Sequence, residues 1–209
     1  FSGPTVIHFS NEKNVVPKKF FLSSTIQQIS FSSTITKICD HAFSLCESLA
    51  QITFPATVTY IGVGSFRGCT SLTKISIPSS VTTIERKAFF ECKSLTEVTL
   101  PSSLTAIKED AFNGCTSLSQ MTLPSSLTEI SKNAFHKCTS YEISIPSSVN
   151  NIGIYAFSNS KIIVADIPCN FTNIGSHWFF ECTSLTQVTI PSSVTSIEMG
   201  AFRNCSSLT

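Results

Sequence analysis

The stretch Cys69-Thr-Ser-Leu-Thr-Lys-Ile-Ser-Ile-Pro-Ser-Ser-Val-Thr-Thr-Ile-Glu-Arg-Lys-Ala-Phe-Phe-Glu91 decides the fold, because almost the same 23 residues begin again at Cys92. The phenylalanine of its Ala-Phe pair recurs at spacings of 23, 23, 23, 23, 22, 22 and 23 residues. These phenylalanines are Phe43, Phe66, Phe89, Phe112, Phe135, Phe157, Phe179 and Phe202. A fixed period in the twenties predicts a solenoid, in which each repeat contacts only its neighbours.

Each repeat contains two short segments with the pattern of β-strands. Ile75 and Ile77 alternate with polar residues, as expected for a half-buried strand, and Pro78 ends it because proline cannot donate to a continuing ladder. The segment from Val81 to Ile84 is apolar at both ends with β-branched residues between, which favours a second short strand. Stacked repeats would then form parallel sheets with strands about 4.8 Å apart.

The Ala88-Phe89-x-x-Cys92 segment has helical spacing. It is far shorter than the roughly 12 residues that a free helix needs, so we expect one helical or 3₁₀ turn held by packing. The sequence therefore predicts an α/β repeat solenoid that is rich in β-structure, with a parallel sheet, a second short strand and a short helical turn in each repeat.

We expect one structural domain with two parts. Residues 1–31 are the least regular and are interpreted as a degenerate capping repeat, and residues 32–209 contain about eight repeats of 22–23 residues. The chain begins at Phe1 and stops at Thr209 in mid-repeat, so we interpret it as a fragment. The last repeat would leave its core and strand edge open, which predicts self-association through that end.

Charge and hydropathy exclude several partners. The net charge is +1 and only 13% of the residues are charged, with Lys and Arg scattered singly. No basic stripe for a phosphate backbone is visible, so we expect no nucleic-acid partner. No apolar run reaches the roughly 18 residues that a membrane-spanning helix needs, so we expect no direct membrane insertion by this segment.

The cysteines are best interpreted as a structural column. Seven of the nine occupy one repeat position, where the spacing of neighbouring strands holds the Cβ atoms too far apart for a disulfide without strain. Cys39 and Cys169 occupy polar positions and are expected to be free thiols, with intermolecular pairing as the alternative. The seven are Cys46, Cys69, Cys92, Cys115, Cys138, Cys182 and Cys205.

Catalytic and metal sites are not expected. His41 and His177 share a repeat position but lie six repeats apart, and His136 occupies a different position, so they cannot converge on a metal ion. The serines lie mostly in Pro-Ser-Ser turns, where a hydroxyl bonds nearby backbone, and no Gly-x-Ser-x-Gly elbow or phosphate loop is present. We predict no enzymatic activity, no cofactor and no metal.

The pattern Leu-x-x-Ile-x-Ile-Pro-Ser-Ser-Val-Thr-x-Ile-x-x-x-Ala-Phe-x-x-Cys-x-Ser resembles the BspA-like leucine-rich repeat family over about residues 29–209. The resemblance implies a right-handed superhelix with its parallel sheet on the concave face. It also implies a secreted or cell-surface protein, with roles in adhesion, aggregation or contact with host proteins such as those of the extracellular matrix. No catalytic residues come with the family.

Departures from the repeat point to a candidate binding site. The outward residues of the first strand are mostly polar and weakly charged, and deviations gather between residues 141 and 178. An indole at the alanine position of its repeat is too large to fit between coils, so we expect Trp178 at the surface, where interface hot spots use such groups. The alternative is drift in a slightly damaged repeat. The predicted binding residues are Tyr141, Glu142, Ile163, Val164, Asp166, Trp178 and Gln187.

Three functional interpretations follow. The first is a non-catalytic, extracellular or cell-surface adhesion module that binds a protein or glycan through the concave strand face. The second is a structural spacer within a larger surface protein, and the third is the substrate-recognition array of an enzyme or effector whose catalytic domain lies elsewhere. Asn170, in Asn170-Phe-Thr172, is a candidate glycosylation acceptor, with a chance match as the alternative.

Overall fold

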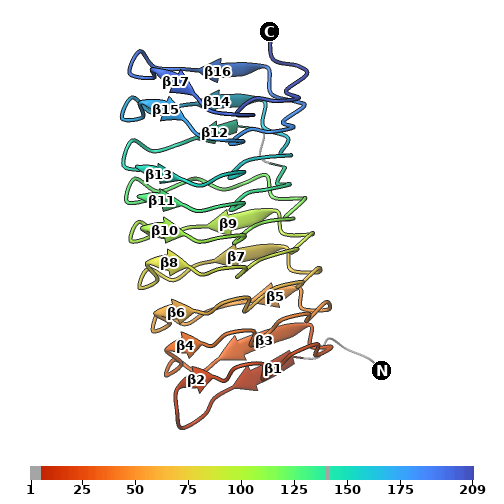
Figure 1. Cartoon of the computed structure of the whole chain (residues 1–209). Helices are drawn as coiled ribbons and strands as arrows, with labels where there is room; N and C mark the ends of the chain where they lie inside the picture. Colours follow the sequence, from red (N-terminus) through yellow and green to blue (C-terminus); the bar gives the residue numbers. More distant parts are fainter. Residues whose placement is uncertain (1–5, 140–141) are drawn as a thin grey trace.

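The computed structural model describes residues 6–139 and 142–209. Each repeat forms one coil of a stack, and consecutive coils follow one another along its length (Figure 1). Most coils contribute one short strand to each of two columns, and strands within a column pair in parallel. The predicted solenoid of parallel strands, with a second short strand in the repeat, is confirmed.

The first column carries the Leu-x-x-Ile-x-Ile segments, and we call its outward surface the strand face. Pairing follows the sequence period, so that Lys74 lies opposite Glu97 and Ile75 opposite Val98. Side chains alternate between the core and solvent, as the pleat requires. The strands are β1 (Val6–Phe9), β3 (Gln28–Phe31), β5 (Gln51–Ile52), β7 (Lys74–Ser76), β9 (Glu97–Thr99), β12 (Glu142–Ser144), β14 (Val164–Asp166) and β16 (Gln187–Thr189).

The second column carries the segment that ends in the second isoleucine of the repeat. Its isoleucines point inward, as Ile84, Ile107 and Ile130 show in consecutive coils. The strands are β2 (Val15–Val16), β4 (Lys37–Ile38), β6 (Tyr60–Ile61), β8 (Thr83–Ile84), β10 (Ala106–Ile107), β11 (Glu129–Ile130), β13 (Asn151–Ile152), β15 (Asn173–Ile174) and β17 (Ser196–Ile197).

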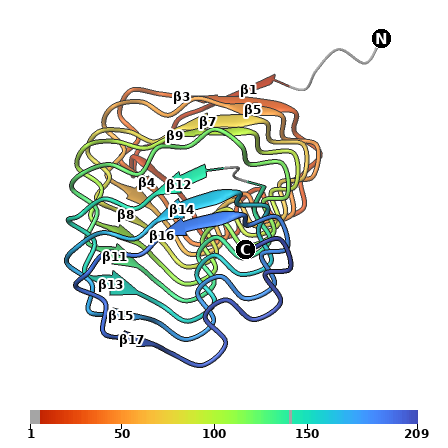
Figure 2. The same ribbon diagram turned by 90° about the horizontal axis from the view of Figure 1, so that it is seen from above.

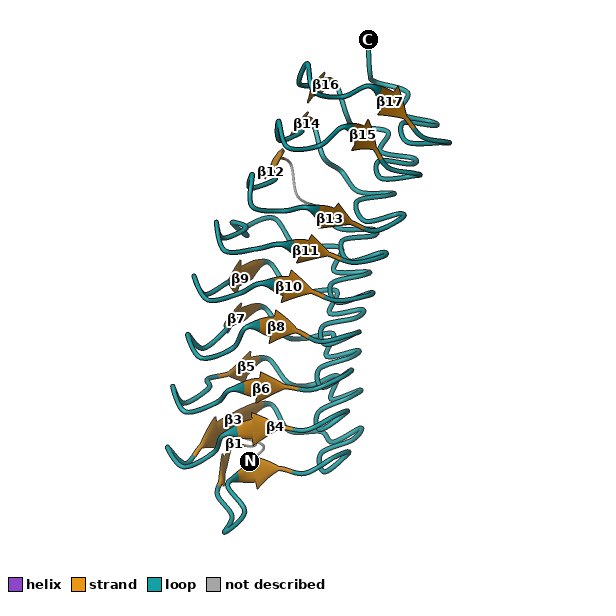
Figure 3. Ribbon diagram, turned by 60° about the vertical axis from the view of Figure 1, so that its left-hand side comes forward, coloured by secondary structure: helices purple, strands orange, loops and turns teal. Residues whose placement is uncertain are grey.

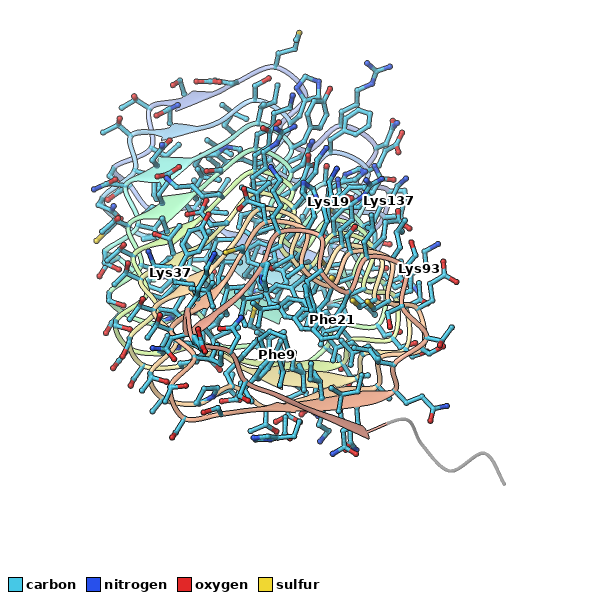
Figure 4. The ribbon with its side chains drawn as sticks, turned by 90° about the horizontal axis from the view of Figure 1, so that it is seen from below. Phe9, Lys19, Phe21, Lys37, Lys93 and Lys137 are labelled. Atoms are coloured by element: carbon cyan, nitrogen blue, oxygen red, sulfur yellow. The ribbon has the colours of Figure 1, made fainter. Side chains whose placement is uncertain are left out.

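Stacked phenylalanine rings run through the core from coil to coil. Neighbouring ring centroids are separated by 5.0 Å between Phe21 and Phe43 and by 5.7 Å between Phe135 and Phe157. Phe21 thus takes the place of the repeat phenylalanine in the first coil. A view along the stack places Phe9 and Phe21 in the interior of the cross-section and Lys93 at its margin (Figure 4).

The Ala-Phe segments form a third column of consecutive turns, and the expected helical turns are absent from the described residues (Figure 3). Alternate backbone N–H groups donate to the next coil. Those of Lys87 and Phe89 donate to the carbonyl oxygens of Glu109 and Ala111, at 3.0 and 2.9 Å. Those between them donate within the coil, as Ala88 does to Glu85 at 3.0 Å. A helix would keep every N–H within its own segment, so the prediction of helical turns was wrong.

Left-handed backbone makes this alternation possible. Lys87 has a φ of 57° and Glu91 a φ of 58°, two residues before and two residues after Phe89. Glycine occupies the same two positions in the coil of Phe66, as Gly64 and Gly68. A residue with positive φ cannot continue a right-handed helix, so these positions break the segment into separate turns whose N–H groups can bond to the neighbouring coil.

Strand pairing within the columns is interrupted between β5 and β7 and between β6 and β8, and at two further places toward the C-terminal end. In the first column, residues 120–123 form only one bridge, Glu97 to Gln120, and no described pairing joins them to β12. Seen along the stack, β12, β14 and β16 are set back from the line of β1 to β9 (Figure 2), and we call this offset the step. In the second column, β13 and β15 do not pair. Among the described residues there is no helix that could span a bilayer.

Candidate functional site

The strand face presents two rows of polar side chains. Paired positions continue from strand to strand, as Gln28 with Gln51 and Val164 with Gln187, and an exposed ion pair joins Lys74 Nζ to Glu97 Oε2 at 2.7 Å. The first row is Gln28, Gln51, Lys74, Glu97, Gln120, Glu142, which is placed by its backbone pairing alone, the apolar Val164, and Gln187; the second is Ser30, Thr53, Ser76, Thr99, Thr122, Ser144, Asp166 and Thr189. The rows form a weakly charged surface of hydroxyl, amide and carboxylate groups.

Hydroxyl groups away from the strand face hold neighbouring coils together. Ser126 Oγ donates to the carbonyl oxygen of Leu104 at 2.6 Å, and Thr128 Oγ1 donates to that of Thr105 at 3.0 Å. These bonds reach one coil back, so the expected bonding of serine hydroxyls to nearby backbone is replaced by bonding between coils. Such bonds satisfy carbonyl groups at the edges of the short strands.

The strand-face hydroxyls behave differently. Within the described part of the chain, Ser76, Thr99, Thr122 and Ser144 are exposed and make no intramolecular side-chain hydrogen bond. Each hydroxyl can donate one hydrogen bond and accept two. The chain therefore uses hydroxyl groups for cohesion between coils and leaves these four available to a ligand, whereas Ser30 Oγ in the same row lies 3.1 Å from His8 Nδ1.

A cavity of about 190 Å³ opens at the step, between residues 118–123 and the coil that contains β12. Its interior is apolar and includes Phe135 and Phe157. Its mouth is marked by Ser119, Thr122 and Ser144, which are exposed. The complete lining is Leu118, Ser119, Met121, Thr122, Leu123, Phe135, Cys138, Ile143, Ser144, Phe157, Ser160 and Ile162.

The cavity lies where the repeat is one residue shorter. Six residues before the repeat proline, the sequence has Leu118 in the coil before the cavity and Ile162 in the coil after it, both fully or almost fully buried. The coil between them has Ser140 at that position in the sequence, and residues 140–141 lie outside the described residues. The cavity lies between Leu118 and Ile162, both of which line it.

Ser160 changes the hydrogen bonding between coils beside the cavity. It takes the place of cysteine in its repeat, and its hydroxyl donates to the carbonyl oxygen of Phe157 in its own coil. Cysteines at this position instead donate to the preceding coil, as Cys138 Sγ does to Phe112 O at 3.2 Å. No described bond joins Ser160 to Phe135 in the preceding coil, so one tie between coils is missing beside the cavity.

Four of the predicted binding residues lie together on the strand face beyond the step. Ile163 is 39% exposed, Val164 is half-buried, and Asp166 and Gln187 are exposed. The pairing places Val164 beside Gln187 in β16, and Asp166 beside Ser144 at the cavity mouth. We call Ile163, Val164, Asp166 and Gln187 the β14 patch.

Two further predicted binding residues lie at the segment that the structure does not describe or describes only in part. Tyr141 lies outside the described residues. Glu142 begins β12 and pairs with Val164 through its backbone, but its side chain lies outside what the structure describes. Both therefore remain predictions.

Trp178 is buried, and the expectation that its indole lies at the surface was wrong. Its side chain is 3% exposed, and its Nε1–H donates to the carbonyl oxygen of Ile152 in the preceding coil at 3.2 Å. One coil earlier, the equivalent carbonyl of Ile130 accepts from the backbone N–H of Gly153 at 2.8 Å. The indole therefore supplies a bond that the backbone supplies elsewhere, at the place where β13 and β15 part.

Gly175 makes room for the indole. A Cβ atom at this position would collide with Trp178 Nε1, and Phe171 packs edge-on against the indole with centroids 5.3 Å apart. The indole of Trp178 thus acts as a wedge, filling the space where the ladder between β13 and β15 is interrupted. It is not available to a partner, and it does not belong to the candidate site.

The seven repeat cysteines form the predicted buried column. Each thiol donates to the carbonyl oxygen of the phenylalanine in the preceding coil, as Cys92 does to Phe66 at 3.1 Å. Burial raises the pKa of the Cys92 and Cys138 thiols to about 12, so both are protonated at neutral pH. A protonated thiol is a hydrogen-bond donor and a poor nucleophile, which is consistent with a structural role.

The other candidate residues are dispersed. Cys169 is exposed and Cys39 half-buried, both with free thiols. His136 Nδ1 lies 2.7 Å from Ser158 Oγ, and burial lowers the pKa of this histidine. His177 stacks against Tyr155 at 4.6 Å in another coil. Among the described residues, no group of three or more His, Cys, Asp or Glu side chains could hold a metal ion.

Asn170, the candidate glycosylation acceptor, is exposed, but its side-chain amide makes a hydrogen bond to another coil. Its Nδ2, the atom to which a glycan would be attached, donates to the carbonyl oxygen of Val149 at 2.6 Å. Serine does the same at the equivalent position in other coils, as Ser193 does to Phe171 at 2.8 Å. Asn170 thus has a structural role in joining coils, and its modification remains a prediction.

Comparison with known proteins identifies one family model, described as BspA type leucine rich repeat region, which matches residues 14–141 and 82–209 in six copies. No curated protein sequence matches the chain.

Among solved structures, a leucine-rich repeat protein from Bacteroides ovatus is 24% identical, with a TM-score of 0.68, over 100% of this chain and 75% of that chain. The pneumococcal vaccine antigen PcpA is 16% identical, with a TM-score of 0.50, over 84% of this chain and 57% of that chain. A leucine rich cell surface protein from Faecalibacterium prausnitzii is 24% identical, with a TM-score of 0.40, over 98% and 82%. The likeness to the Bacteroides ovatus protein supports the leucine-rich repeat fold.

Proposed function

Because the chain belongs to the BspA-type leucine-rich repeat family, we propose that it is a non-catalytic recognition module that binds a protein or glycan ligand through its strand face. We place this activity outside the cell or at the cell surface. Its expected role there is to bind host proteins, including those of the extracellular matrix. The β14 patch and the step beside it are the proposed centre of the contact.

One observation carries the proposal. The hydroxyl groups of Ser126, Thr128 and their repeat equivalents are consumed by bonds between coils, whereas those of Thr99, Thr122 and Ser144 on the strand face have no intramolecular partner. A protein or glycan surface could satisfy them through many modest hydrogen bonds, each worth about 0.5–1.5 kcal/mol net.

The β14 patch adds apolar contact to this polar surface. Ile163 and Val164 follow one another along the chain, while the equivalent pair in the coil of β9 is Thr96 and Glu97. Asp166 is the charged member of the second row. Apolar side chains surrounded by polar ones are typical of the centre of a protein interface.

The test is an array of extracellular host proteins and glycans, probed with the purified chain and two variants. Ile163→Ser should weaken binding to any hit at least tenfold. Ile154→Ser is the matched control, because Ile154 is also 39% exposed but lies away from the strand face, in the segment that leads to Phe157. Equal losses in both variants, or no loss in either, would contradict a site at the β14 patch.

The array also separates the proposed function from the spacer alternative. A spacer would give no saturable hit with a folded chain, and a recognition array within an enzyme or effector would bind its substrate through the same strand face. The first outcome refutes the proposed function.

A further inference from the structure

We propose that a second ligand site lies in the second strand column, where the groove between β13 and β15 binds one neutral sugar ring, either free or at the end of a glycan. The two strands do not pair, and they stand apart in the stack (Figure 3). A groove of about 250 Å³ lies along this interruption, and all of its lining residues belong to the described part of the chain. The groove lies away from the strand face, so the inference is independent of the proposed function.

The interrupted ladder leaves backbone groups of the groove without a partner. The N–H of Gly175 lies at the repeat position from which Gly153 donates to the preceding coil, but it makes no hydrogen bond with a described residue. The carbonyl oxygen of Ile152, its expected acceptor, is bonded instead to the indole N–H of Trp178. The carbonyl oxygen of Asn150 also has no described partner, although its equivalents in the neighbouring coils accept a backbone N–H. Water or a ligand must satisfy such groups.

Amide and carboxylate side chains surround these backbone groups. The side chains of Asn150 and Asn151 are exposed and make no hydrogen bond with a described residue. Glu198 reaches the groove from the last coil, where Asn173 Nδ2 donates to its Oε1 at 2.8 Å. The backbone N–H of Ser176 donates to Glu198 Oε2 at 2.9 Å. These two bonds hold the carboxylate in place and leave each of its oxygens able to accept a further hydrogen bond.

This set of polar groups selects an uncharged ligand with several hydroxyl groups. Amide side chains both donate and accept hydrogen bonds, and the carboxylate of Glu198 only accepts. Neighbouring hydroxyl groups of a sugar match such a set, because each donates one hydrogen bond and accepts two. No Lys, Arg or His side chain lines the groove, so an anion would meet the negative charge of Glu198 without a compensating positive charge.

The shape of the groove limits the ligand to one ring. The buried side chains of Trp178 and Phe171 close the groove beneath, so a ligand lies at the surface and meets the polar groups with its edge. Pockets for drug-sized ligands have volumes of about 300–1,000 Å³. At about 250 Å³, the groove holds a single sugar ring, and further rings of a glycan would extend into solvent.

Soluble glycosides provide a direct test. Saturation-transfer difference NMR measures the binding of methyl β-D-glucopyranoside, methyl α-D-mannopyranoside and methyl β-D-galactopyranoside, with the methyl glycoside of glucuronic acid as the charged control. Trp178 is the only tryptophan of the chain, so its fluorescence reports on the groove beside it. We expect at least one neutral glycoside to bind saturably and to change this fluorescence. The glucuronide should bind roughly tenfold more weakly or worse than the best neutral glycoside, because like charges repel.

Two variants locate the site. Asn151→Ala should weaken binding by roughly threefold or more, and it should fold normally because Ala106 occupies the same repeat position. Thr83→Ala is the matched control, since Thr83 occupies that position in a coil whose strand β8 pairs with β10, and it should leave binding unchanged. Glu198→Gln removes the charge and keeps the shape, so discrimination against the glucuronide should fall by roughly tenfold.

Three outcomes would overturn the inference: no saturable binding of any neutral glycoside, unchanged binding in Asn151→Ala, or equal binding of the glucuronide. Tight binding of N-acetyl-alanine amide in place of the glycosides would indicate a peptide site and would also overturn it. A glycan hit on the array together with glycoside binding indicates the end of a glycan, and glycoside binding alone indicates a free sugar.

The array separates this site from the proposed strand-face site. Ile154 borders the groove, so a glycan hit that is weakened by Ile154→Ser and Asn151→Ala, but not by Ile163→Ser, belongs to the groove. A hit that is weakened by Ile163→Ser alone belongs to the strand face. Failure of the glycoside test removes the groove site and leaves the strand-face function standing.

Discussion

Removing one phenylalanine ring from the middle of the stack should cost far more stability than removing the ring at its end. Phe112 is fully buried and stacks on Phe89 at 5.4 Å and on Phe135 at 5.6 Å. Among the described residues, Phe202 stacks on Phe179 alone, at 5.6 Å, and it is partly exposed. A buried Phe→Ala substitution costs about 3–5 kcal/mol, and a ring with one stacked neighbour should cost roughly half of that.

Urea unfolding followed by far-ultraviolet circular dichroism measures both variants under the same conditions. We expect Phe112→Ala to lose about 3–5 kcal/mol and Phe202→Ala about 1.5–2.5 kcal/mol of unfolding free energy. The reasoning assumes that each coil is stabilised by its nearest neighbours. Equal losses in the two variants, or a loss below about 2 kcal/mol for Phe112→Ala, would refute it.

Three further predictions follow from the coils. In the native chain, a thiol reagent should modify Cys169 rapidly and Cys39 more slowly. The seven buried thiols should react only after unfolding, because burial raises their pKa and blocks access of the reagent. Labelling of all nine cysteines in the native chain would contradict the buried cysteine column. Trp178→Phe should cost about 1–3 kcal/mol in urea unfolding, because the carbonyl of Ile152 loses its donor, and a neutral result would contradict the wedge. In the last coil, Ile197 is 55% exposed and Met199 is 76% exposed. The chain should therefore self-associate in sedimentation equilibrium, and the Ile197→Lys variant should be monomeric. A wild-type chain that is monomeric at every concentration would contradict association through this end.

The repeat spacing was sufficient to predict the coils, the two strand columns and the buried cysteines. Each of these depends on apolar residues that recur at fixed positions, and stacking is the arrangement that buries them all. The Ala-Phe turns could not be predicted in the same way, because Ala88-Phe89-x-x-Cys92 fits a helix as well as a series of turns. Gly64 and Gly68 were the available signal, since glycine two residues before and after the phenylalanine indicates left-handed backbone.

The candidate site was predicted only in part. Ile163, Val164, Asp166 and Gln187 lie on the strand face as their period-two pattern indicates. Trp178 was misplaced because a single repeat cannot show that a neighbouring ladder opens to admit an indole, although Gly175 three residues earlier was a clue.

The cavity was missed for a related reason. Its signal in the sequence is the repeat that is one residue shorter between Cys138 and Pro146. Alignment on the recurring phenylalanine shows which residues are present in every repeat. It does not show how neighbouring coils respond when the repeat is one residue shorter.

The most direct test of the central claim, that ligand binds through the strand face, uses two matched double variants and one array hit. Ser144→Arg with Thr189→Arg blocks the strand face on either side of Asp166, whereas Ser147→Arg with Ser192→Arg adds the same groups to exposed Pro-Ser-Ser turns of the same coils. Surface plasmon resonance should show at least tenfold weaker binding for the first pair and unchanged binding for the second. Unchanged binding in the first pair, or an equal loss in both, would contradict recognition through the strand face.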